Sequence, residues 1–152
     1  MQKEILKDFF EKHIKGTPYK AIVIDYKIFL CKLTNAVCSG VGIEDSNWKV
    51  YITSRALKHL FDKKPAEEFF FLIDNLRKIV KYPDKVYENK TSKRGEYCLI
   101  KRISNFDYLC SIEVMKSPLA EIQIATAFRL RDNDYIKKYT LLWSWEDGAP
   151  PS

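Results

Sequence analysis

The segment from Glu96 to Leu130 constrains the fold most, because it predicts three consecutive β-strands. Apolar and polar residues alternate along each part of it, EYCLIKRIS, NFDYLCSIEVMK and EIQIATAFRL. This period-two pattern is typical of a sheet with one buried face. Between the strands, Ser104 to Asp107 and Lys116 to Pro118 are short, polar and typical of turns. The segment therefore predicts an antiparallel meander whose apolar face must be covered by other elements.

The residues before the meander predict the helices that cover it. Lys3 to Lys15 place apolar side chains at helical intervals and end at Gly16. Two more amphipathic helices follow, RALKHLFDKK after an N-cap at Thr53 or Ser54 and AEEFFFLIDNLRKIVK after Pro65.

Other segments carry weaker patterns. Residues 20–34 are rich in β-forming residues and predict one bent strand or two. Residues 35–47 predict a loop. We expect this loop to separate an N-terminal helix and β extension, residues 1–47, from a main domain, residues 48–152. Lys85 to Glu88 predict a short strand, and YIKKYTLLWSW predicts an amphipathic helix or a final strand.

The composition predicts a folded protein of the cell interior. A chain of 152 residues with 46% apolar residues can bury a core without disulfides or a metal. The sequence has no apolar run long enough to cross a bilayer and no signal-peptide pattern. We therefore expect a soluble cytoplasmic protein without membrane contact. The four cysteines lack the paired spacing of zinc sites and lie among apolar neighbours, which predicts reduced, buried thiols without a metal.

The charge distribution favours a polyanionic partner. The formal net charge is +6, and residues 1–47 contribute little of it, with seven basic and six acidic residues. The basic excess therefore lies in the half that holds the meander. Such an excess is compatible with RNA as a partner.

His59 is the strongest candidate for proton transfer, because an imidazole can both take and give a proton near neutral pH. Several cations of the later strands are candidates to hold a phosphate and stabilise its charge: Lys101, Arg102, Arg129 and Arg131. The alternative is a surface histidine beside an ordinary solvated face.

Two further features admit a structural and a functional interpretation. The hydroxyl of Thr126 stands between apolar residues of a predicted strand, so it either bonds the backbone or donates to a phosphate. Lys90, Lys93 and Arg94 cluster in a glycine-containing turn, which is either solvated or in contact with a phosphate backbone.

The familiar motifs of several enzyme classes are missing from the sequence. It contains no Walker loop, GxGxxG, HExxH or GxSxG pattern. Nucleotide-driven, metalloprotease and α/β-hydrolase chemistry therefore have no support.

The order of the elements resembles the superfamily of barnase, EndoU, colicin and RelE-like RNases, closest to its phage and polymorphic-toxin branches. The resemblance covers roughly residues 48–145. It rests on a helix with His59, a second helix, and then the segments YPDKVYEN, EYCLIKRIS, FDYLCSIEVMK and EIQIATAF. It implies an α+β fold with helices packed on one face of a four- or five-stranded antiparallel sheet and a cleft on the other face.

By this resemblance the protein is a metal-independent endoribonuclease, toxin-like or phage-associated. Family members cleave RNA, often tRNA, without a cofactor: the ribose 2′-hydroxyl attacks the adjacent phosphate and leaves a cyclic phosphate. The implied catalytic residues are His59 as acid or base, Lys101 or Arg102 as the phosphate-holding cation, and Thr126. The RNA-binding residues that we expect beside them are Lys58, Lys90, Lys93, Arg94, Arg129 and Arg131. A toxin of this kind is delivered into the cytoplasm of a target cell and has a cognate inhibitor protein.

The sequence leaves two alternatives to an endoribonuclease open, and it also leaves the role of the N-terminal extension open. The first alternative is a non-catalytic RNA- or protein-binding module of the same fold. The second is an immunity or antitoxin protein, which the basic charge disfavours because an inhibitor of a basic nuclease would be acidic. The N-terminal extension, residues 1–47, is a docking segment, an addition to the sheet or a cover over the cleft.

Overall fold

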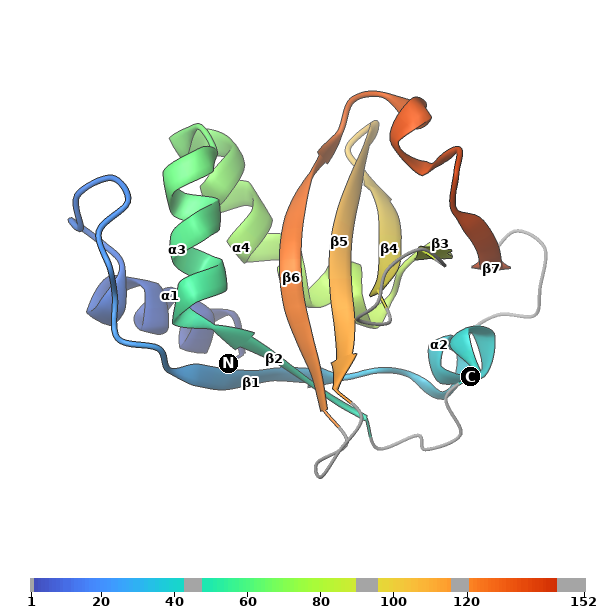
Figure 1. Ribbon diagram of the computed structural model, residues 1–152, viewed down its shortest axis with the longest axis horizontal. Coiled ribbons are helices and arrows are strands. Elements are labelled where there is room, and N and C mark those ends of the chain that lie inside the picture. The colour runs from blue at the N-terminus through green and yellow to red at the C-terminus, as the bar shows by residue number, and fades with distance from the viewer. Residues whose placement is uncertain (1, 43–47, 90–95, 116–120, 145–152) are drawn as a thin grey trace.

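The computed structural model describes residues 2–42, 48–89, 96–115 and 121–144. Within these ranges the chain forms four α-helices, α1 Gln2–His13, α2 Asn35–Val41, α3 Ser54–Lys63 and α4 Ala66–Lys81. A 3₁₀-helix, η1, covers Asn133–Ile136. The strands are β1 Lys27–Lys32, β2 Lys49–Thr53, β3 Lys85–Asn89, β4 Glu96–Ile103, β5 Phe106–Met115, β6 Glu121–Leu130 and β7 Thr140–Ser144. The fold is α+β, as the sequence predicts (Figure 1).

The described strands form one mixed sheet in the order β1-β2-β6-β5-β4-β3-β7. The expectation of four or five antiparallel strands is wrong. The sheet has seven strands, and β2 runs parallel to β6, pairing Lys49 to Tyr51 with Glu121 to Gln123. The extra strands come from the two ends of the chain: β1 and β2 join one side of the meander, and β7 pairs with β3 on the other. These pairings link distant segments, which a local pattern does not reveal.

The meander itself is confirmed. Strands β3, β4, β5 and β6 pair antiparallel in sequence order. At the tight turn from β4 to β5, Ser104 and Asn105 have positive φ angles of 52° and 71°. Two consecutive positive φ angles are typical of the turn whose twist matches a hairpin.

The helices cover one face of the sheet. Apolar residues of α1, α3 and α4 form one buried cluster with Leu99, Cys110, Ile112 and Ala127 of the meander. Leu30 of β1 and Val37 of α2 belong to the same cluster. The described part of the segment 1–47, residues 2–42, therefore shares the core of the main domain, and its strand β1 extends the sheet. We call the other side of the meander the open face.

Local capping residues explain where the central helices begin. The Thr53 side chain accepts a hydrogen bond of 3.1 Å from the backbone N–H of Ala56 and so caps α3. Pro65 directly precedes α4. The predicted loop at residues 35–47 is wrong in part, because α2 forms there, capped by Thr34 and ended by Gly42 at a φ of 80°.

The segment after β6 crosses over the end of the meander before it returns as β7 (Figure 1). For YIKKYTLLWSW the sequence left an amphipathic helix or a final strand open. The strand is correct for Thr140–Ser144, which form β7 after the short helix η1. Trp143 of β7 packs against Gly40 of α2, where an added Cβ would lie 2.6 Å from the Trp143 Cβ and Cγ atoms. Gly40 thus permits the close approach that anchors β7.

The cysteines are free and buried, as expected. Burial raises the pKa of the Cys31 thiol to about 11 and that of Cys98 to about 12. Their thiols therefore stay protonated and poorly reactive at neutral pH. Separately, none of the helices in the described ranges has the length and apolar character needed to span a membrane.

Candidate functional site on the open face

The open face carries a second, smaller apolar cluster. Cys98, Ile100 and Leu109 are its buried members, and side chains from β3, β6 and the crossing segment pack against them: Tyr87, Phe128, Leu130, Ile136 and Tyr139. Because strand side chains alternate between faces, these residues stand opposite the helix-covered core. The crossing segment therefore supplies the only cover that this cluster has among the described elements.

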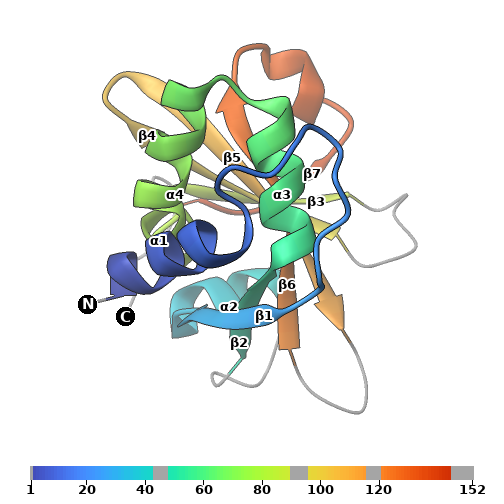
Figure 2. The ribbon, with the colours of Figure 1, turned by 90° about the vertical axis from the view of Figure 1, so that its left-hand side faces the viewer.

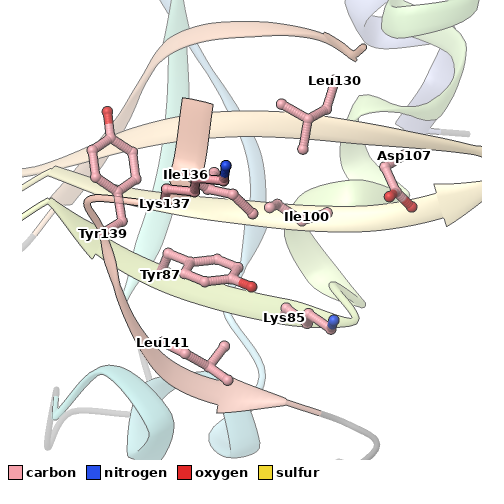
Figure 3. A pocket seen from close by; sticks show the side chains of 9 residues that line it. All are labelled: Lys85, Tyr87, Ile100, Asp107, Leu130, Ile136, Lys137, Tyr139 and Leu141. Carbon is pink, nitrogen blue, oxygen red and sulfur yellow. The ribbon is translucent and has the colours of Figure 1, made fainter. Parts of the chain in front are cut away.

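A cavity of about 460 Å³ lies between the open face and the crossing segment. One wall comes from the sheet, including Leu141 of β7, and the other from residues 136–139, which cross over it before the chain returns as β7 beside β3 (Figure 3). Its lining residues are Lys85, Tyr87, Ile100, Asp107, Leu130, Ile136, Lys137, Tyr139 and Leu141. It is large enough for a small organic ligand.

Aromatic packing fixes the Tyr139 side chain at one end of the cavity. The Tyr139 ring meets the Tyr135 ring edge-on at 5.9 Å, and Tyr135 in turn packs edge-on against Phe128 at 5.1 Å. The two tyrosines also share a hydrogen bond. Burial, then the neighbouring Tyr135, Cys98 and Glu96, raise the pKa of the Tyr139 hydroxyl. Tyr139 is therefore a hydrogen-bond donor at all ordinary pH values.

Next to Tyr139, four polar side chains form what we call the Glu96 cluster: Asn89, Glu96, Ser111 and Thr126. The fully buried Ser111 hydroxyl donates to the Glu96 carboxylate. The Asn89 side-chain amide donates to the other oxygen of Glu96 at 2.8 Å. Thr126 lies directly across from Ser111 in the β5–β6 pairing, on the same face.

A second carboxylate borders this cluster. Glu113 of β5 pairs directly across from Glu96 of β4. Two carboxylates and two hydroxyls thus share one region of the open face. Such a group can accept a proton from a bound hydroxyl and orient it by hydrogen bonding. In the described ranges, no group of three or more His, Cys, Asp and Glu side chains is arranged to hold a metal ion.

The predicted residues of α3 lie elsewhere. His59 is exposed on α3, one turn before Asp62. Lys58 is only 5% exposed. Its ammonium donates to Asp62 and to the Pro18 carbonyl oxygen, each at 2.7 Å, and so holds residues 18–20 against α3 (Figure 2). The Lys58 ammonium is thus already hydrogen-bonded within the fold.

The predicted cations of the meander divide between the two faces. Lys101 faces the helix side, where its ammonium donates to the Tyr82 carbonyl oxygen at 2.8 Å and lies 3.7 Å from Asp84. Arg102 faces the open side and pairs with Asp107 at 3.3 Å. Because Asp107 lines the cavity, Arg102 is the predicted cation that the structure brings beside it.

The remaining predicted cations do not converge on the cavity. The Arg129 guanidinium lies over the Phe106 ring, 3.6 Å from its centroid. Arg131 forms a 2.5 Å ion pair with Glu68 of α4. Lys90, Lys93 and Arg94 lie outside the described residues.

Sequence reasoning missed Glu96, Ser111, Lys85 and Tyr87. One signal was present: Ser111, like Thr126, is a hydroxyl among apolar residues of a strand. The decisive information, which strand face stays uncovered, comes from the tertiary structure. Comparison with protein families, curated proteins and solved structures gave no match to this chain.

Proposed function

We propose that the protein is a metal-independent endoribonuclease whose active site lies on the open face. The observation that carries this proposal is the Glu96 carboxylate, hydrogen-bonded to Ser111 and next to a tyrosine-lined cavity that also bears Lys85. The α+β architecture, with helices on one face only, agrees with the RNase superfamily that the sequence resembles.

The chemistry needs a base, a proton donor and a positive charge. Glu96 accepts the proton of the ribose 2′-hydroxyl, whose oxygen attacks the adjacent phosphorus. The bond from phosphorus to the 5′-oxygen breaks, and that oxygen receives a proton from a water molecule, which leaves a 2′,3′-cyclic phosphate. Tyr139, which burial and its neighbours keep protonated, lies beside this cluster, and Lys85, at the other end of the cavity, attracts the phosphates of the RNA backbone.

His59 remains the alternative base. The proposal based on Glu96 differs from it in one respect that can be tested: Glu96 belongs to the same face as the cavity, whereas His59 lies on the outer surface of α3. The substrate is RNA in either case, with tRNA as the first candidate.

The test is cleavage by the purified protein in EDTA. Total tRNA and a single-stranded RNA are incubated with wild type and with Glu96→Gln, and the products are separated on a denaturing gel. We expect discrete fragments ending in cyclic phosphate from wild type only. Cleavage by both proteins alike would point to a contaminating nuclease or to another base, and intact RNA with folded wild type would contradict the proposal.

A specific observation favours one second candidate, an RNA-binding module that does not cleave. Lys58, Lys101 and Arg131 each have an ion-pair partner in this chain, which leaves fewer cations for catalysis. In this case RNA binds in a salt-dependent way and stays intact. A filter-binding measurement on the same samples separates this outcome from cleavage.

A further inference from the structure

We infer that the open-face cavity binds one nucleotide unit of the substrate, its base packed against Tyr87 and its phosphate held by Lys85. The inference rests on the proposed function for the identity of the ligand as RNA. It goes beyond that function because it identifies where the nucleotide beside the reacting phosphate lies and which residues select for it.

The cavity walls suit a flat, partly apolar ring. Ile100, Leu130 and Leu141 of the sheet line the cavity together with Ile136 of the crossing segment. The Tyr87 ring lies between Lys85 and Tyr139 along the open face (Figure 3). Stacking on an aromatic side chain is the usual way in which proteins bind an unpaired base.

Lys85 supplies the charge that a phosphate needs. Among the residues that the structure describes, it has no ion-pair partner, and its neighbours are already engaged: Lys137 pairs with Asp134, and Asp107 with Arg102. Lys85 and Tyr87 are two residues apart on β3, so both side chains project from the same face, about 7 Å apart along the strand. This spacing matches the reach from a base to the phosphate of the same nucleotide.

Tyr139 connects the cavity to the Glu96 cluster. Tyr139 lines the cavity. After burial and the neighbouring Tyr135 and Cys98, the negative charge of Glu96 also raises the pKa of its hydroxyl. A nucleotide held by Tyr87 and Lys85 therefore lies next to the Glu96 cluster, with its own phosphate at the Lys85 end, four residues along β3 from Asn89, which pairs with Glu96. The same nucleotide then sets the preference of the enzyme for one base over another.

The experiment is a calorimetric titration of the folded protein, in EDTA, with the 3′-monophosphates of the four ribonucleosides. We expect saturable binding of one molecule per chain for at least one of them. Inorganic phosphate and the uncharged nucleoside, each titrated separately, bind more weakly than that nucleotide. Failure of all four nucleotides to bind at millimolar concentration would overturn the inference.

Three variants locate the binding. Lys85→Ala weakens it about tenfold or more, because a charge-assisted bond is lost, and Tyr87→Leu weakens it about five- to a hundredfold by removing the stacked ring. Tyr87→Phe, which keeps the ring, binds like wild type. The matched control is Lys78→Ala, an exposed lysine on α4. Wild-type affinity in both Lys85→Ala and Tyr87→Leu would overturn the inference.

The two proposals fail in distinguishable ways. RNA cleavage that is unaffected by Lys85→Ala, without nucleotide binding, would remove the cavity from the mechanism and leave the endoribonuclease standing. Specific nucleotide binding without any cleavage of RNA would uphold the cavity and contradict the enzyme.

Discussion

The two faces of the sheet use their polar residues in different ways. On the helix side, charges are paired with one another, as in the ion pair of buried Lys58 with Asp62 or the more exposed pair of Arg131 with Glu68. On the open face, exposed Arg102 pairs with Asp107, but Glu96 is held by neutral donors, and Lys85 has no ion-pair partner in the described part of the chain. The difference indicates that charges of the first kind stabilise the structure, while those of the second kind remain available to a ligand.

The largest expected effect is on the helix side. Lys58→Ala leaves the partly buried Asp62 carboxylate without its cation, and the loss should stay below the roughly 3–5 kcal/mol that removing one partner of a fully buried pair costs, because the Lys20 backbone N–H still donates to Asp62. Urea unfolding followed by circular dichroism measures the loss. Lys78→Ala, an exposed control, should change stability by less than about 0.5 kcal/mol. A stable Lys58→Ala protein with weakened RNA binding would restore Lys58 as an RNA ligand and break the comparison.

A substitution in α2, far from the cavity, should change the shape of the cavity by displacing β7. In Gly40→Val the new side chain collides with Trp143, so β7 must shift and carry one wall of the cavity with it. We expect a loss of about 1–3 kcal/mol in stability together with weaker nucleotide binding. Ser39→Ala, at the neighbouring exposed position, is the control. Unchanged binding in Gly40→Val would show that the crossing segment does not shape the site.

Two adjacent residues sharpen the comparison, because Lys101 and Arg102 face opposite sides of β4. Arg102→Ala, at the cavity, should slow RNA cleavage about tenfold, the loss of one charge-assisted contact. Its effect on stability should be small because the pair with Asp107 is exposed. Lys101→Ala should leave the cleavage rate unchanged. Equal effects of the two substitutions on cleavage would mean that the side of β4 on which a cation lies does not determine its contribution to cleavage.

The smallest effect concerns pH. Although burial opposes it, the hydrogen bonds from Lys58 and the Lys20 backbone hold the pKa of the Asp62 carboxyl below its ordinary value. A lowered native pKa gives stability that is present above about pH 4 and is lost as the pH falls through the native value. Wild type should therefore lose stability on acidification more steeply than Asp62→Asn, compared by thermal unfolding between neutral and acidic pH. Parallel curves would contradict this role.

The sequence predicts what local patterns determine. The strands of the meander and the Thr53 cap follow from alternation and capping preferences within a few residues. The places of β1, β2 and β7 in the sheet depend on distant pairings. Nothing in the sequence near Lys58 indicates that residues 18–20 will lie over its side chain. The role that we propose for Glu96 depends on which face the helices leave open, and this follows only from the assembled fold.

The most direct test of an active site on the open face compares the RNA cleavage rates of Glu96→Gln and His59→Ala with that of wild type, in EDTA and with all three proteins shown to be folded. Removal of a general base lowers the rate by about a hundredfold or more. We expect this loss for Glu96→Gln and a nearly unchanged rate for His59→Ala. The reverse result would contradict the account and return the catalytic base to α3.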